Sequence, residues 1–346
     1  MTKTATFAFR GESITPGGLL PDKKDLFDKL RDRDVQPIVS LGAEAAFTPD
    51  GVISHDLVNE SDLRAVGVTP REDVGVIINR LDRSVKLDDM PDSWRDDMPP
   101  VANNNTLRSL AFRKHRVQSE ILEPLDAGIP TALIESIVDV DVFLQAYPAK
   151  EYVIKPTSGT FGKGVVHVKA SEVMQQFADP EIFGKMIIQP AYDFSLDLPD
   201  SIRPYDEKAK ADFEAVAKGD MAKEIRMYGM YSPDATVVYP VLRGLKDGTD
   251  YWAAIDPDSV PEQVTNRSRD IIARIAHETG SRAVYSALDI GYGSLDGADP
   301  EFKEIEFNGR MPYLFGKDKH VAVAGILRDH LADQITASAN AEDDTI

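Results

Sequence analysis

The sequence predicts an α/β protein, because three patterns recur along its 346 residues. Residues 4–9, 22–33 and 35–41 read as strand, amphipathic helix and strand, a spacing typical of a parallel sheet covered by helices. Residues 152–168 place a glycine-rich loop between two strands, and residues 301–308 alternate polar with apolar side chains. Helices are therefore expected to alternate with, and pack against, more than one sheet.

The composition is that of an ordinary globular protein, with 42% hydrophobic and 28% charged residues. Lys and Arg total 39 against 58 Asp and Glu, so the formal net charge is −19. Such a field repels nucleic acid and anionic lipid, and neither is expected as a partner. The absence of cysteine excludes disulfides, thiolate zinc sites and cysteine nucleophiles. No segment approaches the ~20 apolar residues of a membrane span, so a cytoplasmic location is expected.

The remaining elements are predicted from periodicity and from turn signals. Strands are expected at residues 74–78, 131–137, 152–154, 165–168, 183–189, 225–231, 236–242, 283–290 and 301–307. Helices are expected at residues 106–125, 207–218, 264–280 and 321–335. Loops are expected at residues 82–100 and 291–300, and in the solvated insertion 192–222 outside its helix. Residues 337–346 are expected to form a disordered tail.

The loop that follows Lys155 has the chemistry of an anion-binding site. Its glycines let backbone N–H groups approach an anion, and the lysine adds a positive charge. It differs from a Walker A loop because Lys163 is followed by Gly164 rather than by Ser or Thr. It also leads into a strand, whereas a dinucleotide-binding glycine turn leads into a helix. A triphosphate site and an ordinary glycine-rich hairpin are therefore both consistent with the loop.

A second group of residues has the chemistry of a magnesium site. An extended strand over residues 301–308 would carry Glu304, Glu306 and Asn308 on one face and apolar side chains on the other. Asp289, at the end of the preceding strand, can supply a ligand from across the hairpin. Mg²⁺ prefers such oxygen ligands. The alternative is the polar face of an exposed hairpin, and the phosphate-type loop in the same chain favours the metal site.

Taken together, these motifs resemble the ATP-grasp superfamily, to which glutathione synthetase, D-alanyl-D-alanine ligase and biotin carboxylase belong. Four motifs match in the family's order: residues 104–130 with Lys114, Lys155 with its loop, residues 224–226 with Arg243, and Asp289 with residues 306–308. The resemblance covers residues 103–312 and implies ATP held between two antiparallel sheets. It implies an N-terminal α/β domain over 1–102, a small ATP-grasp subdomain over 103–190 and a large one over 191–336.

The resemblance also implies roles for individual residues. Lys114 and Lys155 would neutralise phosphates, Gln189 and Ala191 would lie against adenine, and Asp289, Glu306 and Asn308 would bind one or two Mg²⁺, with Mn²⁺ as a substitute. The lid over the triphosphate would comprise Ser158, Gly159, Thr160, Phe161, Gly162, Lys163 and Gly164. The substrate carboxylate and the transferring phosphoryl group would be gripped by Arg226, Arg243 and Arg310.

The function implied by the resemblance is that of an ATP-dependent carboxylate–amine ligase. It would make an amide through an acyl phosphate and release ADP and phosphate. The expected partners are a small-molecule carboxylate and an amine, an amino acid or a peptide among them, and a homodimer is expected. Two alternatives remain open: a phosphotransferase on the same ATP site and a non-catalytic nucleotide-binding module. The full set of lysines and metal ligands argues against the second.

Overall fold

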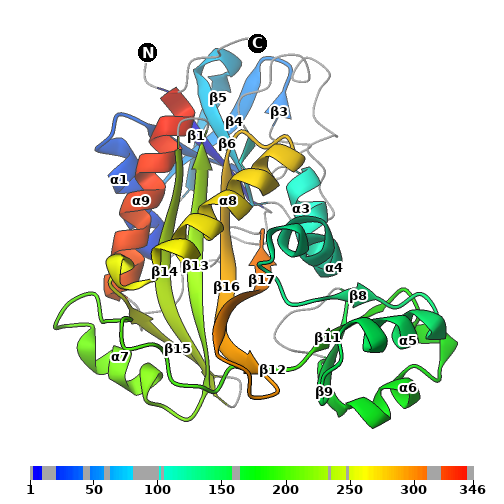
Figure 1. Cartoon of the computed structure of the whole chain (residues 1–346). Coiled ribbons are helices and arrows are strands. Elements are labelled where there is room, and N and C mark those ends of the chain that lie inside the picture. Colours follow the sequence, from blue (N-terminus) through cyan, green and yellow to red (C-terminus); the bar gives the residue numbers. More distant parts are fainter. Residues whose placement is uncertain are drawn as a thin grey trace.

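A computed structural model describes most of the chain (Figure 1). The residues described are 3–9, 21–41, 47–57, 63–80, 101–102, 105–157, 164–232, 235–246, 249–309 and 321–340. These residues form three sheets, one of them with both parallel and antiparallel strand pairs and two antiparallel. The predicted architecture, in which helices pack against more than one sheet, is thus confirmed.

The N-terminal unit is built on the predicted strand–helix–strand pattern. Strand β1 (Thr4–Phe9) pairs in parallel with β2 (Gln36–Leu41) and with β6 (Val74–Arg80). Helix α1 (Pro21–Arg31) connects the first two strands and buries Leu26, Phe27 and Leu30. The apolar spacing that predicted this helix therefore faces the core, as in any helix that covers a sheet.

The sequence did not predict the antiparallel part of this sheet. Strands β3 (Phe47–Thr48), β4 (Gly51–Leu57) and β5 (Leu63–Pro70) extend it beyond β2, and β7 (Val101–Ala102) joins it at β6. Gly51 has a φ of +159°, and a Cβ there would lie 2.1 Å from the Thr69 carbonyl oxygen. The close approach of β4 and β5 therefore requires a glycine at this position.

The small subdomain has a four-stranded antiparallel sheet in the order β10–β9–β11–β8. Its strands are β8 (Ala132–Leu133), β9 (Glu151–Pro156), β10 (Val166–Lys169) and β11 (Met186–Pro190). Helices α5 (Ile137–Ala146) and α6 (Val173–Gln176) cover one face and share a core with Tyr152 and Ile154. The other face, which carries Lys155, turns toward β16 and β17 (Figure 1).

The large subdomain is a six-stranded antiparallel sheet. Its path is β12–β16–β13–β14–β15, with β17 paired to β16. The strands are β12 (Tyr192–Asp193), β13 (Ala222–Ser232), β14 (Ala235–Lys246), β15 (Thr249–Ala254), β16 (Val284–Leu295) and β17 (Glu301–Asn308). The hairpin expected from the sequence is formed by β13 and β14. Helix α7 (Lys210–Ala217) lies against β15, so the insertion expected to be solvated contributes to packing.

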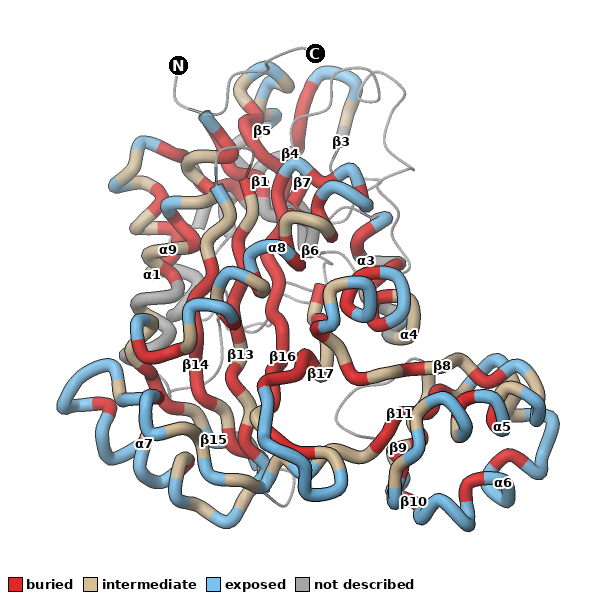
Figure 2. Tube along the Cα trace, viewed as in Figure 1, coloured by how far each residue is buried: buried red, intermediate tan, exposed pale blue. Residues whose placement is uncertain are grey.

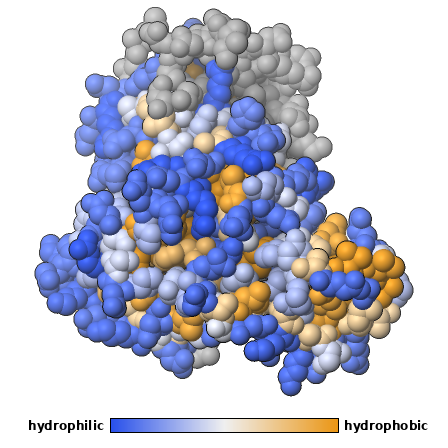
Figure 3. Space-filling view, viewed as in Figure 1, coloured by the Kyte–Doolittle hydropathy of each residue, from blue (hydrophilic) through white to orange (hydrophobic). Residues whose placement is uncertain are grey.

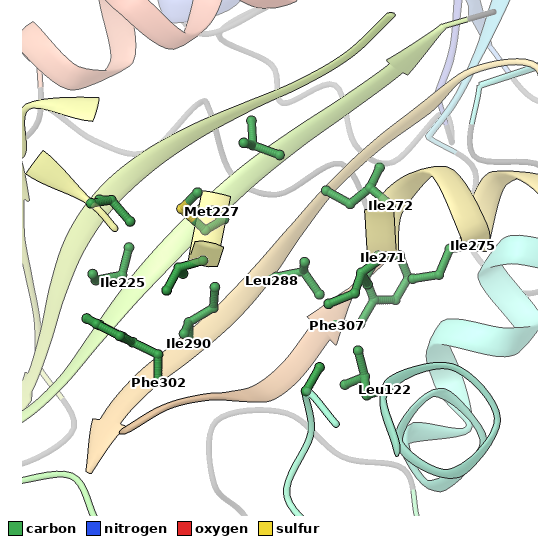
Figure 4. Close-up of a cluster of buried hydrophobic side chains, with 14 of the residues drawn as sticks. Leu122, Ile225, Met227, Ile271, Ile272, Ile275, Leu288, Ile290, Phe302 and Phe307 are labelled. Atoms are coloured by element: carbon green, nitrogen blue, oxygen red, sulfur yellow. The ribbon is translucent and has the colours of Figure 1, made fainter. Parts of the chain in front are cut away.

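One face of the large sheet packs on helix α8 (Glu262–Glu278). Four side chains predicted to face inward, Ile271, Ile272, Ile275 and Ala276, are buried. They pack against Leu288 and Phe307 from the sheet and against Leu122 from the helical segment over residues 105–125 (Figure 4). Each aliphatic side chain removed from water contributes ~1.5–3 kcal/mol. This layer holds β16 and β17, which carry the predicted metal ligands, in a fixed register.

The opposite face of the large sheet shares a core with the N-terminal unit. Helix α9 (Val321–Asn340) inserts Leu331, Ile335 and Ala339 between the two sheets. Figure 2 shows buried residues along α9 and along β13, β14 and β16, where the units meet. The predicted disordered tail is wrong for residues 337–340, because these continue α9 and bury Ala339. Residues 341–346 lie outside the described part of the chain.

The helix predicted for residues 106–125 is interrupted. It forms α3 (Asn105–Phe112), α4 (Lys114–Arg116), a π-helical turn over Val117–Leu122 and a 3₁₀ turn that contains Pro124. In the π-helical turn, the Gln118 side chain donates to the Ile305 carbonyl at 2.9 Å. The helical segment over residues 105–125 therefore bonds directly to β17, beside the predicted metal ligands.

Two other predictions are wrong. Only 132–133 of the expected strand 131–137 is extended, because Ser136 and Asp139 form a reciprocal capping box that starts α5. The first half of the loop expected over 291–300 is strand, since β16 continues to Leu295. Two of the glycines that suggested a loop make room for the Phe194 ring instead, because a Cβ would lie 2.3 Å from this ring on Gly291 and 2.6 Å from it on Gly293.

The surface of the small subdomain is unusually apolar. On α5, Val138 and Val142 are 64% and 59% exposed. Figure 3 shows the hydrophobic patch over this subdomain, whereas the surface of the large subdomain in the same view is mainly hydrophilic with smaller hydrophobic areas. Among the helices of the described residues, none has the length and hydropathy needed to span a membrane.

Candidate active site

Three oxygen-bearing side chains predicted as metal ligands meet on β16 and β17. Asp289 lies directly opposite Glu306 in the strand register, and Asn308 follows two residues later on the same face. The Asn308 amide donates to Asp289 Oδ2 at 2.9 Å. The strand register therefore places Asp289, Glu306 and Asn308 on one face of the hairpin, as predicted.

Glu304 does not belong to this group. A β-bulge between Asp289 and Ile290 shifts the register, so that Ile290 pairs with Glu304. Glu304 therefore faces the other side of the sheet. There it is fully buried and accepts from Arg267 Nε of α8 at 2.7 Å. Burial raises the pKa of Glu304 to about 7 against the pull of Arg267. The sequence predicted regular alternation, which a one-residue bulge reverses.

Arg226, on the neighbouring strand β13, binds the same aspartate. Its Nε donates to Asp289 Oδ1 at 2.6 Å and its Nη2 donates to Asp289 Oδ2 at 2.8 Å, which makes a bidentate ion pair. The Asp289 side chain is only 5% exposed. Burial opposes the charge of Arg226, but the Asp289 carboxylate holds its pKa above the ordinary value. Arg226 is therefore a permanent cation beside the predicted metal ligands.

Arg243 lies one strand further from Asp289, on β14. It donates to Glu224, which faces Arg243 across the β13–β14 pair. The Arg226 and Arg243 guanidinium carbons lie 5.2 and 5.3 Å from the centroid of the Trp252 ring, within range of a cation–π interaction. The two arginines are thus held between carboxylates and one aromatic ring.

Burial and the nearby Asp289 carboxylate raise the pKa of Glu224 to about 7, although Arg243 and Arg226 act in the opposite direction. Glu224 and Trp252 were not among the predicted site residues. The alternation of Glu224, Arg226 and Tyr228 along β13 is a signal that they share a face. No comparable signal marks Trp252, because β15 was not predicted.

The chain crosses from the small sheet to the large one at residues 189–192. Gln189 is 2% exposed, and its amide donates to Thr131 Oγ1. Ala191 donates its N–H to the Glu151 carbonyl at 2.9 Å. Strand β12, which follows at once, pairs with β16. The two residues predicted to contact adenine therefore stand at the junction of the sheets, and both already have hydrogen-bond partners.

The structure describes the predicted phosphate-binding residues only in part. Lys155 lies on the face of β9 opposite α5 and α6, and Gly164, with a φ of +75°, ends the loop beside Pro156. Lys114 begins α4, and its side chain is not described. Outside the described residues lie Ser158, Gly159, Thr160, Phe161, Gly162, Lys163 and Arg310.

No protein-family model matches this sequence, and no curated protein matches it. The whole architecture, however, matches solved structures over nearly their full length. Among them is the VanG D-Ala:D-Ser ligase from Enterococcus faecalis, with a TM-score of 0.55, 12% identity, and coverage of 98% of this chain and 100% of that one. The chain has the ATP-grasp fold.

Two further structures with this fold match equally completely. The ATP-grasp ligase PsnB, solved with a phosphomimetic variant of its minimal precursor, Mg and ADP, has a TM-score of 0.54 and 12% identity, covering 98% and 99% of the two chains. The D-alanyl-alanine synthetase A from Vibrio cholerae O1 biovar eltor has a TM-score of 0.51 and 11% identity, covering 98% of each chain. The expected fold, with two antiparallel sheets behind an α/β unit, is confirmed.

The donor set of this ATP-grasp fold suits a hard cation. Asp289 and Glu306 supply carboxylate oxygens, and Asn308, whose amide nitrogen already donates to Asp289, keeps its carbonyl oxygen for another partner. In the described ranges, no three His, Cys, Asp or Glu side chains are placed so that they could hold a metal ion by themselves. An ion held here would accordingly need ligands besides the protein's carboxylates, and Mg²⁺ usually takes these from substrate phosphates and water.

Proposed function

We propose that the protein is an ATP-dependent carboxylate–amine ligase that forms an amide bond and releases ADP and phosphate. The observation that carries the proposal is the convergence of Asp289, Glu306 and Asn308 beside Arg226 on one face of the large sheet. The proposal is supported by the structural similarity of nearly the whole chain to a D-alanyl-alanine synthetase and to a D-Ala:D-Ser ligase. The proposed substrates are an amino acid or peptide carboxylate and an amine, as the names of those examples suggest.

In this proposal, Asp289, Glu306 and Asn308 hold one or two Mg²⁺ ions, for which Mn²⁺ can substitute. The ion supplies positive charge to the terminal phosphates of ATP. Lys114, Lys155 and the residue 158–164 loop bind the triphosphate, and the junction at Gln189 and Ala191 receives the adenine. Phosphoryl transfer depends mainly on positioning and on charge, which these groups provide.

The reaction has two steps. A substrate carboxylate oxygen attacks the γ-phosphorus, the bond to ADP breaks, and an acyl phosphate forms. The amine nitrogen then attacks the acyl carbon, the bond to phosphate breaks, and the nitrogen loses a proton. Arg226, Arg243 and Arg310 are the proposed contacts of the carboxylate and of the transferred group, because guanidinium groups bind both in bidentate fashion.

The test is to measure ADP and free phosphate with pools of amino acids and dipeptides. A ligase releases phosphate only when both an acid and an amine are present. A phosphotransferase makes ADP with a single acceptor and leaves the phosphate on the product, and a nucleotide-binding module makes neither. Light scattering during gel filtration tests the proposed homodimer. Phosphorylated product without amide would replace the ligase proposal by the phosphotransferase.

A further inference from the structure

Arg226 lies between two carboxylates. It forms a bidentate pair with Asp289, and its Nη2 is also 3.7 Å from Glu224 Oε1. The side chain of Arg226 is 14% exposed, that of Asp289 5% and that of Glu224 20%, so water screens their interactions only weakly. The guanidinium therefore has a second acidic partner within a short movement of its present one.

Glu224 is itself held in place by neighbouring strands. Arg243 of β14 donates to it, and the Trp252 ring of β15 lies against both guanidinium groups. Because Glu224, Arg243 and Trp252 occupy facing positions in the strand register, the backbone fixes the spacing between them. Arg226 can thus move between acceptors while its surroundings stay in place.

A divalent cation and Arg226 need the same oxygens. Both oxygens of Asp289 accept from Arg226, and Oδ2 also accepts from Asn308. A cation coordinated by Asp289 would take lone pairs that the guanidinium uses and would repel it at short range. The affinity of the cation therefore includes the free energy needed to displace Arg226 from Asp289.

We propose that Glu224 is a positioning residue that takes the Arg226 guanidinium from Asp289 when a divalent cation binds there. This inference rests on the proposed metal role of Asp289. Displaced toward Glu224, the guanidinium stays on the site face and against Trp252. Cation binding then sets Arg226 for its contact with substrate, and Glu224 makes that change favourable.

A double-mutant cycle on Mn²⁺ affinity tests the proposal, with calorimetric titrations of the full chain without nucleotide. Arg226→Gln should tighten Mn²⁺ binding about tenfold, because it removes the competitor. Glu224→Gln should weaken binding about tenfold in the wild-type background and much less in the Arg226→Gln background. Equal effects of Glu224→Gln in both backgrounds, or weaker binding by Arg226→Gln, would overturn the proposal.

Arg203→Gln is the matched control, since Arg203 forms an exposed pair with Asp256 away from the site. It should leave Mn²⁺ affinity unchanged. Asp289→Asn should abolish Mn²⁺ binding. Failure of wild type and Arg226→Gln alike to bind Mn²⁺ would overturn the inference even if the ligase assay succeeded. The Mn²⁺ cycle can likewise hold in a protein that makes no amide, so the two proposals can fail separately.

A measurement without substitutions in the site guards against misfolded variants. The chain has two tryptophans, and Trp94→Phe leaves Trp252 as the single reporter. Magnesium should change the emission of Trp252 as Arg226 moves across its ring, with the same midpoint as the calorimetric titration. Calorimetric binding of Mg²⁺ without a change in emission would contradict the proposed movement.

Discussion

The two sides of the candidate site belong to units that are stabilised differently. The small subdomain, which carries Lys155, has a core of its own that includes Phe143, Tyr152 and Phe177. The large sheet, which carries Asp289, packs one face on α8 and shares the core on its other face with the N-terminal unit through α9. The side that carries Lys155 can therefore be altered without disturbing the side that carries Asp289. Changes in the N-terminal unit, by contrast, reach the Asp289 side through the shared core.

The largest effect is expected at the metal ligands. Asp289→Asn keeps the shape of the side chain but removes the negative charge that pairs with Arg226 and a cation. Catalytic turnover should fall by at least about 100-fold, measured as ADP release in the ligase assay. Asp256→Asn, at a half-buried carboxylate that pairs with Arg203, is the control. Wild-type turnover by Asp289→Asn would show that the large sheet does not carry the metal site.

The difference between the cores can be tested by two cavity-forming substitutions. Leu331→Ala in α9 and Phe177→Ala in the small subdomain each remove a buried side chain and should cost about 3 kcal/mol. Hydrogen exchange should show Leu331→Ala loosening β1 and β13 together, because both contact α9. Phe177→Ala should loosen β9 and leave β13 protected. Equal loosening of all sheets by both variants would contradict the separation of the small-subdomain core from the core around α9.

The acid–base behaviour of Glu224 gives a test confined to the large sheet. Its pKa of about 7 in the folded protein lies above the ordinary 4.5, so the folded state binds the proton more tightly than the unfolded chain. This contribution to stability is complete below the ordinary pKa and is lost as the pH rises through about 7. The wild-type free energy of unfolding should fall by about 3 kcal/mol over this pH range, and Glu224→Gln should remove this fall. Urea unfolding at several pH values measures it. An unchanged pH profile in this variant would contradict the raised pKa.

The smallest effect is expected at the start of α5. Ser136→Ala removes the side chain that accepts from the Asp139 N–H, and the loss should be about 1 kcal/mol. Because α5 belongs to the small core, turnover at saturating ATP should change little. Ser136→Thr, which keeps the cap, should behave as wild type. A large loss of turnover in Ser136→Ala would show that the small subdomain is coupled to the metal side.

Much of the fold was predictable, and the errors have physical causes. Helices α1 and α8 and strands β1, β13, β16 and β17 follow from apolar periodicity, because their buried faces are regular. The prediction of a strand over 131–137 was wrong because its β-branched residues are typical of strands, whereas the cap at Ser136 starts a helix. The loop expected over 291–300 failed because Gly291 serves a tertiary contact with Phe194, which no local pattern reveals.

The candidate site was predictable where it depends on spacing within one strand pair. Asp289, Glu306 and Asn308 meet because β16 and β17 form a hairpin. Glu304 was assigned to the wrong face because a bulge has no signal in residue type. The pairing of Arg226 with Asp289 and of Arg243 with Glu224 joins strands up to 63 residues apart in the sequence, and no periodicity predicts which partner each arginine takes.

The position of α9 has a consequence for biosynthesis. A ribosome makes β1 and α1 first, but their apolar faces pack against Leu331 and Ile335, which it makes more than 300 residues later. The small subdomain closes its core within residues 134–188 and can fold as soon as these have emerged. We therefore expect nascent chains that stop before residue 321 to contain a folded middle segment and an N-terminal sheet still dependent on chaperones.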